Sequence, residues 1–83
     1  FGNADSKLAS ILLISAMEFG IAKNDEIEIQ IPLTHKDIAS LVGVTRETVS
    51  IELKKFDKKK YISYRKKKIV IKNKVELRKK AIF

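Results

Sequence analysis

The chain has 83 residues, a formal net charge of +8 and no cysteine. A chain of this length forms one domain, and the absence of cysteine excludes disulfide bridges, thiolate metal sites and cysteine nucleophiles. No apolar run reaches the roughly 18 residues that a membrane-spanning helix needs, so no membrane association is expected. Because the chain starts at Phe1, we expect it to be part of a longer protein.

The first 33 residues predict one helix and one strand. Ser6 is a candidate N-cap of a helix over residues 7–19, whose apolar side chains recur at intervals of three and four, and Gly20 ends it. A polar loop is expected over residues 20–26. Isoleucines alternate with polar residues over 27–31, which predicts a short, half-buried strand.

Two helices separated by a short turn are expected next. Thr34 is a candidate N-cap, and Asp37 stands where the acidic partner of a capping box belongs. Gly43 lies in the turn, and Thr45 is the candidate cap of a second helix over residues 46 to about 60. This layout is typical of a helix-turn-helix, whose second helix can enter the major groove of DNA.

The last third of the chain predicts a β-hairpin and a terminal helix. Two β-rich runs, 61–64 and 69–71, flank a basic turn over 65–68, and with the earlier strand they can form a three-stranded sheet. Asn73 is a candidate cap of a helix over residues 74–80. The side chains expected to pack this helix are Val75, Leu77 and Ala81. The predicted fold class is α+β: a winged helix-turn-helix with a three-helix core, a small antiparallel sheet or wing, and a C-terminal helix.

The charge is distributed unevenly along this chain. Residues 1–33 contain two basic and five acidic residues, whereas residues 34–83 contain sixteen basic and five acidic ones. Such one-sided cationic density predicts a polyanionic partner, either nucleic acid or, less favourably, an anionic membrane surface. A lysine-rich surface that only improves solubility explains the net charge equally well, so the charge alone leaves both interpretations open.

The segment over residues 31–50 resembles the C-terminal DNA-binding domain of Crp/Fnr bacterial transcription regulators. Its stretch Arg46-Glu47-Thr48-Val49-Ser50 is similar to the recognition-helix signature of that family, and the hairpin over 62–71 is similar to its wing. The resemblance extends from about Lys7 to Leu77. It implies sequence-specific binding of double-stranded DNA by the output module of a transcription regulator.

The resemblance also implies roles for individual residues. Arg46 and Glu47 match positions that read base edges, since arginine can donate to guanine and glutamate can accept from the cytosine amino group. Ser50 lies one turn further along and faces the same groove. The positions that match phosphate contacts are Thr34, His35, Lys36, Thr45, Thr48, Lys54, Arg65 and Lys67.

Two residues depart from the family pattern. Ile51 stands where the family usually has arginine. A helical projection that places Val49, Leu53 and Phe56 on the inner face directs Ile51 away from the core, so we expect it to contact a thymine methyl group. Lys66 stands where the wing tip often has glycine, which predicts a differently shaped or looser turn.

The family resemblance implies further partners for the whole protein. A full-length regulator is expected to be a cytoplasmic homodimer that also contacts RNA polymerase, whereas this part alone is expected to be a monomer. No cofactor is expected in this part, and the sequence does not identify the effector of the missing sensor domain.

Nothing in the sequence indicates an enzyme or a metal site. His35 is the sole histidine, and Ser50 has no neighbouring base in a recognisable catalytic arrangement. Two alternatives to DNA binding remain open: a basic winged helix that binds RNA, and one that uses Ile51 for protein contacts. The basic runs 58–60 and 65–68 are interpreted as a phosphate clamp, ahead of a solvated face or membrane attachment. Six neutralised phosphates would give a slope of about −5 for log affinity against log salt.

Overall fold

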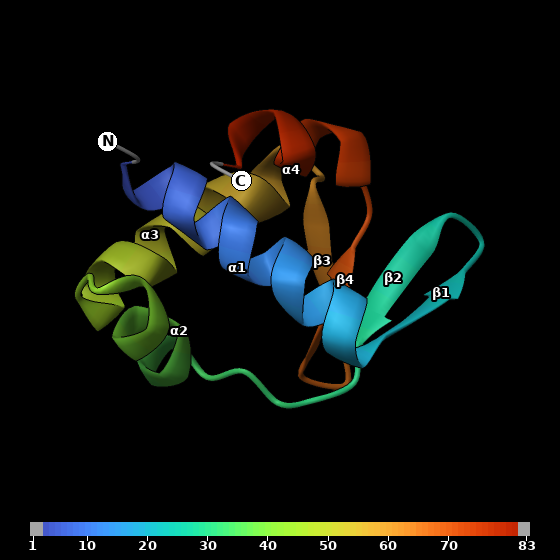
Figure 1. Ribbon diagram of the computed structural model, residues 1–83, viewed down its shortest axis with the longest axis horizontal. Coiled ribbons are helices and arrows are strands. Elements are labelled where there is room, and N and C mark those ends of the chain that lie inside the picture. The colour runs from blue at the N-terminus through green and yellow to red at the C-terminus, as the bar shows by residue number, and fades with distance from the viewer. Residues whose placement is uncertain (1–2, 82–83) are drawn as a thin grey trace.

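The computed structural model describes residues 3–81 and contains four helices and four strands within that range (Figure 1). The elements in chain order are α1 (Ala4–Phe19), β1 (Gly20–Lys23), β2 (Glu26–Ile29), α2 (His35–Val42), α3 (Arg46–Lys58), β3 (Ile62–Arg65), β4 (Lys68–Ile71) and α4 (Lys74–Lys80). This is the predicted winged helix-turn-helix: α1, α2 and α3 form the three-helix core, and α4 follows the β3–β4 wing.

The sheet has four antiparallel strands in the order β1-β2-β4-β3, so the prediction of three strands was wrong. Residues 20–26, expected to be a loop, contain β1 and a two-residue turn. Asn24 and Asp25 form this turn with φ of 53° and 65°. Asn and Asp tolerate that left-handed conformation better than most residues, so the pair was a hairpin signal in the sequence. Figure 1 shows the β1–β2 hairpin extending away from the helices.

Helix α1 begins earlier than predicted and ends where expected. Asn3, rather than Ser6, is the N-cap, because the Asn3 side chain accepts a hydrogen bond from the Ser6 backbone N–H. At the other end, the Gly20 N–H donates to the Ala16 carbonyl. A Cβ at Gly20 would collide with that carbonyl and with the Ile27 side chain. Glycine is needed here because β1 leaves the helix directly beside β2.

The hydrophobic core orients α3. Val49, Leu53 and Phe56 are each no more than 2% exposed, which confirms the predicted inner face of this helix. They join buried residues of α1 and of the inner face of the sheet in one cluster. Ile51 is 55% exposed, as the helical projection predicted. The opposite face of α3 is therefore presented to solvent.

The helix-turn-helix has the caps that the sequence predicted. Thr34 Oγ1 accepts from the Asp37 N–H at 3.0 Å, and Asp37 Oδ2 accepts from the Thr34 N–H at 3.2 Å, which completes the capping box. Gly43 ends α2 with φ of 74°, and its N–H donates to the Ala39 carbonyl. Thr45 Oγ1 accepts from the Thr48 N–H at 3.1 Å and so begins α3.

The later elements differ from the prediction in three places. Helix α3 ends at Lys58 rather than near Lys60, because Lys60 has a φ of 65° and leaves the helical conformation. In α4, Leu77 is buried as expected, but Val75 is 61% exposed and does not pack the core. Ile31 lies beyond the end of β2, although it still packs against the core.

The β3–β4 turn is tight and contains two residues, so of the two predicted outcomes, a differently shaped or a looser turn over residues 65–68, the looser turn was wrong. Arg65 pairs with Lys68, so only Lys66 and Lys67 form the turn. Their φ angles are 52° and 66°. A two-residue turn with both residues left-handed matches the right-handed twist of the strands, but it suits Asn and Gly better than lysine.

The capping box of α2 predicts a measurable stability loss. Thr34→Ala removes the acceptor for the Asp37 N–H, and we expect the free energy of unfolding to fall by about 1 kcal/mol at neutral pH. Urea unfolding of the two proteins measures this difference. An unchanged free energy of unfolding would show that the cap does not stabilise α2.

The same cap depends on pH through Asp37. Hydrogen bonds from Thr34, chiefly from its side chain and then from its backbone, hold the pKa of Asp37 below its ordinary value. Because the folded-state pKa is the lower one, this stabilisation is complete above about pH 4 and is lost as the pH falls through the folded-state pKa. Asp37→Asn should lose correspondingly less stability than the wild type on acidification.

The strained wing turn predicts a stabilising substitution. Lys66→Gly should raise the free energy of unfolding by up to about 1 kcal/mol, because glycine adopts a positive φ without steric cost. Lys68→Gly is the matched control, because Lys68 lies in β4 of the same hairpin, and it should be destabilising. Thermal unfolding measures both effects. Destabilisation by both substitutions would contradict the assigned strain.

Candidate nucleic-acid interface

The first turn of α3 presents two charged side chains to solvent. Arg46 and Glu47 are exposed, and neither side chain forms a hydrogen bond or ion pair with any residue that the structure describes. They follow the Thr45 cap directly, so the start of the helix is fixed while their side chains stay available. The structure therefore leaves both predicted base-reading groups unoccupied by internal contacts.

The outer face of α3 continues with three further predicted site residues. Ser50 is half-buried, whereas Ile51 and Lys54 are exposed. With Arg46 and Glu47 they form one solvent-facing surface, which we call the outer face of α3. The side chains of this face can lie beside DNA because the opposite side of the helix is buried in the core.

Ser50 also has a partner that sequence reasoning missed. Its Oγ lies 2.7 Å from Nδ1 of His35, the first residue of α2. The predicted phosphate contact and the predicted base-reading residue are thus hydrogen-bonded to one another. The two residues are 15 positions apart, so only the crossing of the two helices brings them together.

Several predicted phosphate contacts gather at the helix starts. Thr34 caps α2 and Thr45 caps α3, and both are exposed; Lys36 is exposed in the first turn of α2. Thr48 is half-buried, and its Oγ1 lies 2.9 Å from Oγ1 of Thr45. Unpaired backbone N–H groups and the helix dipole favour anions at such positions.

The wing residues have different surroundings. Arg65 forms ion pairs with Glu26 at 3.2 Å and with Glu28 at 3.6 Å, contacts that the sequence did not reveal. Lys67 is exposed in the turn, with no ion pair inside the described part of the chain. Nearby on β3, burial and then the charge of Asp57 raise the pKa of Tyr64, so its phenol keeps its proton at neutral pH.

The two basic runs, interpreted together as a phosphate clamp, lie at opposite ends of β3. Residues 58–60 lie at the end of α3, just before β3, whereas Lys66 and Lys67 form the turn at the other end of that strand (Figure 1). A four-residue strand separates the two ends by roughly 13 Å. A phosphate contact by one run therefore does not imply a contact by the other.

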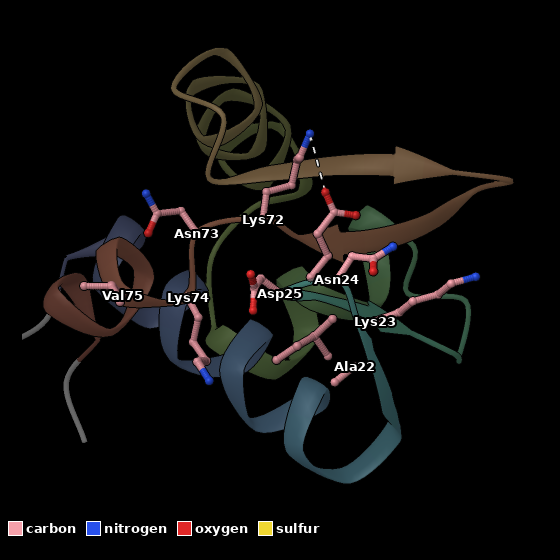
Figure 2. A pocket seen from close by; sticks show the side chains of 10 residues that line it. Ala22, Lys23, Asn24, Asp25, Lys72, Asn73, Lys74 and Val75 are labelled. Carbon is pink, nitrogen blue, oxygen red and sulfur yellow. Dashed lines mark ion pairs between the residues drawn. The ribbon is translucent and has the colours of Figure 1, made fainter.

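A hollow on the surface lies elsewhere. It measures about 520 Å³, between the β1–β2 turn and the start of α4, and none of the predicted DNA contacts lines it. Figure 2 shows its lysines, Lys23, Lys72 and Lys74, pointing in different directions, so their charges do not converge on one bound anion. Within residues 3–81 no group of three potential metal ligands is found, and no helix is long and apolar enough to cross a membrane.

Comparisons with known proteins agree with this geometry. The chain is 43% identical over 72 residues to the global nitrogen regulator of Nostoc sp. strain PCC 7120, which covers 87% of this chain and 32% of that protein. It is 42% identical, with the same coverage, to the global nitrogen regulator of Synechococcus elongatus. The chain thus spans about a third of the length of these relatives.

The fold is similar to solved regulator structures. The CO-dependent transcription factor CooA from Carboxydothermus hydrogenoformans superposes with a TM-score of 0.85 at 28% identity, covering 94% of this chain and 36% of that one. CprK in complex with o-chlorophenolacetic acid gives a TM-score of 0.83 at 27% identity, covering 93% and 33%. Residues 6–80 match the Crp-like helix-turn-helix domain, and the chain belongs to this family, as its resemblance to Crp/Fnr regulators indicated.

Proposed function

We propose that this domain binds double-stranded DNA sequence-specifically, as the output module of a Crp/Fnr-type transcription regulator. The outer face of α3 carries the proposal, because it presents an arginine, a glutamate and an isoleucine on a helix that the core holds in fixed orientation. A helix of this kind fits the major groove, where donors, acceptors and methyl groups distinguish all four base pairs.

The base-reading residues differ in what they recognise. The Arg46 guanidinium can donate two hydrogen bonds to O6 and N7 of guanine, whereas the Glu47 carboxylate can accept from the cytosine N4 amino group. Ile51 offers only apolar surface, which fits the methyl group of thymine. Together these residues would specify neighbouring positions of one half-site.

The phosphate contacts would place α3 in the groove. Thr34 and Lys36 at the start of α2, Thr45 at the start of α3 and Lys67 on the wing would each bind a phosphate, so the contacts would hold the domain at several points of the DNA backbone. Lysine at a left-handed turn position costs roughly 1 kcal/mol that glycine would avoid. The two lysines at this turn place two positive charges at the tip of the wing, where they can reach phosphates.

For the whole protein we propose a homodimer, with half-sites about one helical turn, roughly 34 Å, apart. Each monomer would contribute one outer face of α3, so the two-fold axis of the protein would match that of the site. We further propose that the full-length regulator acts in the cytoplasm, where it contacts RNA polymerase. Its effector would bind outside the domain described here.

Salt dependence tests DNA binding and separates the two basic runs. Four charged contacts, from Lys36, Lys54, Arg65 and Lys67, should give a slope of about −3.6 for log affinity against log salt. Lys67→Ala should make the slope less steep by about 0.9, whereas Lys59→Ala, at the far end of β3, should leave it unchanged. Fluorescence anisotropy with a labelled duplex measures the salt slopes of the wild type, Lys67→Ala and Lys59→Ala.

The same titration includes structured RNA as a competitor. DNA binding predicts that duplex DNA displaces the probe far better than RNA of equal length and charge. A slope near zero, or preferential displacement by RNA, would contradict the proposed function.

The role of Ile51 is tested by a change of specificity. Ile51→Arg should replace the preference for a thymine at one position by a preference for guanine, because arginine donates where isoleucine offers only apolar contact. Selection of bound duplexes from a random pool gives both consensus sequences, and Lys55→Arg on the same helix is the control. Identical consensus sequences for wild type and Ile51→Arg would show that Ile51 does not touch a base.

A further inference from the structure

One side-chain hydrogen bond joins α2 to α3 within residues 3–81. It connects Nδ1 of His35 with Oγ of Ser50 at 2.7 Å, and both residues are half-buried. No other hydrogen bond of either side chain is found among the described residues. The remaining ring nitrogen of His35, Nε2, therefore has no protein partner in that part of the chain.

The conformation of Ser50 is not the usual one for a serine inside a helix. Such a serine commonly donates to the backbone carbonyl one turn earlier. Ser10 in α1 does so, since its Oγ lies 3.0 Å from the Ser6 carbonyl oxygen. Ser50 instead turns its hydroxyl toward His35, so the interaction between the helices, rather than α3 itself, sets its direction.

The chemistry of imidazole then determines what Ser50 can offer to a base. A neutral imidazole has one N–H donor and one acceptor nitrogen. A phosphate oxygen only accepts, so if Nε2 carries the proton and donates to a phosphate, Nδ1 must accept. The hydroxyl proton of Ser50 is then committed to Nδ1, and only the lone pairs of Oγ remain for the DNA.

We propose that His35 is a positioning residue that makes Ser50 a reader of base amino groups. This inference rests on the proposed DNA binding. His35 donates a hydrogen bond from Nε2 to a backbone phosphate, and its Nδ1 accepts a hydrogen bond from the Ser50 hydroxyl. Ser50 Oγ can then only accept, and it does so from adenine N6 or cytosine N4. Ser50 then disfavours guanine O6 and thymine O4, which are themselves acceptors. A serine with a freely rotating hydroxyl would satisfy either kind of group and discriminate little.

Selection from a random duplex pool, followed by affinity measurements, tests the proposal. Ser50→Ala first identifies the base pair whose preference depends on Ser50. At that pair the wild type should favour an amino-bearing base over a keto-bearing one by about tenfold, a typical effect of one good base contact. His35→Ala should reduce this ratio to about threefold or less and should weaken binding to every sequence.

Lys36→Ala is the matched control, because Lys36 is the neighbouring residue of α2 and a predicted phosphate contact. It should make the salt slope less steep by about 0.9 without changing the base preference. His35→Ala should instead change the base preference and leave the salt slope unchanged, since a neutral imidazole releases no counterion. His35→Phe keeps a ring between the helices and so controls for a disturbance of the fold by alanine. It should reduce the base preference as His35→Ala does.

Three outcomes would overturn the inference while leaving DNA binding intact. They are an unchanged base preference in both His35 variants, a wild-type preference for a keto-bearing base, and no effect of Ser50→Ala on any base pair. Failure of the proposed function is a separate result, because the wild type would then bind no duplex at any salt concentration.

Discussion

The burial of Val49, Leu53 and Phe56 fixes the rotation of α3, and every proposed contact with DNA depends on that rotation. Truncating one buried aliphatic or aromatic side chain typically costs 2–5 kcal/mol, whereas an exposed ion pair contributes about 1 kcal/mol or less. Because successive residues of a helix are about 100° apart, a slip of one position would replace Val49, Leu53 and Phe56 in the core by the polar residues Ser50, Lys54 and Asp57. No surface ion pair among residues 3–81 is strong enough to offset such a change.

Local signals explain why so much of this arrangement could be predicted from the sequence. The Thr34–Asp37 capping box, the left-handed Gly43 and the Thr45 cap each act within four residues, and the structure contains all of them. The errors were local as well. Asn3 and Ser6 are equally good caps, and Asn24-Asp25 lacks the glycine that usually marks a two-residue hairpin.

Contacts between distant residues could not be predicted in this way. The His35–Ser50 bond depends on how closely α2 and α3 cross, and the Arg65–Glu26 pair joins residues 39 positions apart through the sheet. Periodicity places each side chain on a face of its own element, but it does not say which faces meet. The sequence therefore predicted on which element each candidate site residue lies, whereas the contacts between these residues could not be predicted.

These connections give the cationic residues unequal roles. In the proposed complex, a phosphate would compete with Glu26 and Glu28 for the Arg65 guanidinium, so the net contribution of Arg65 to binding would be the difference between two similar interactions. Lys67 has no such partner in the described residues, so its proposed phosphate contact would break no ion pair there. The two glutamates hold Arg65 against the sheet and offset its charge at that place. In the proposed complex, affinity would then come mainly from the lysines without ion pairs in the described residues, whereas discrimination between bases would come from the groups that the core and the α2–α3 crossing hold in place.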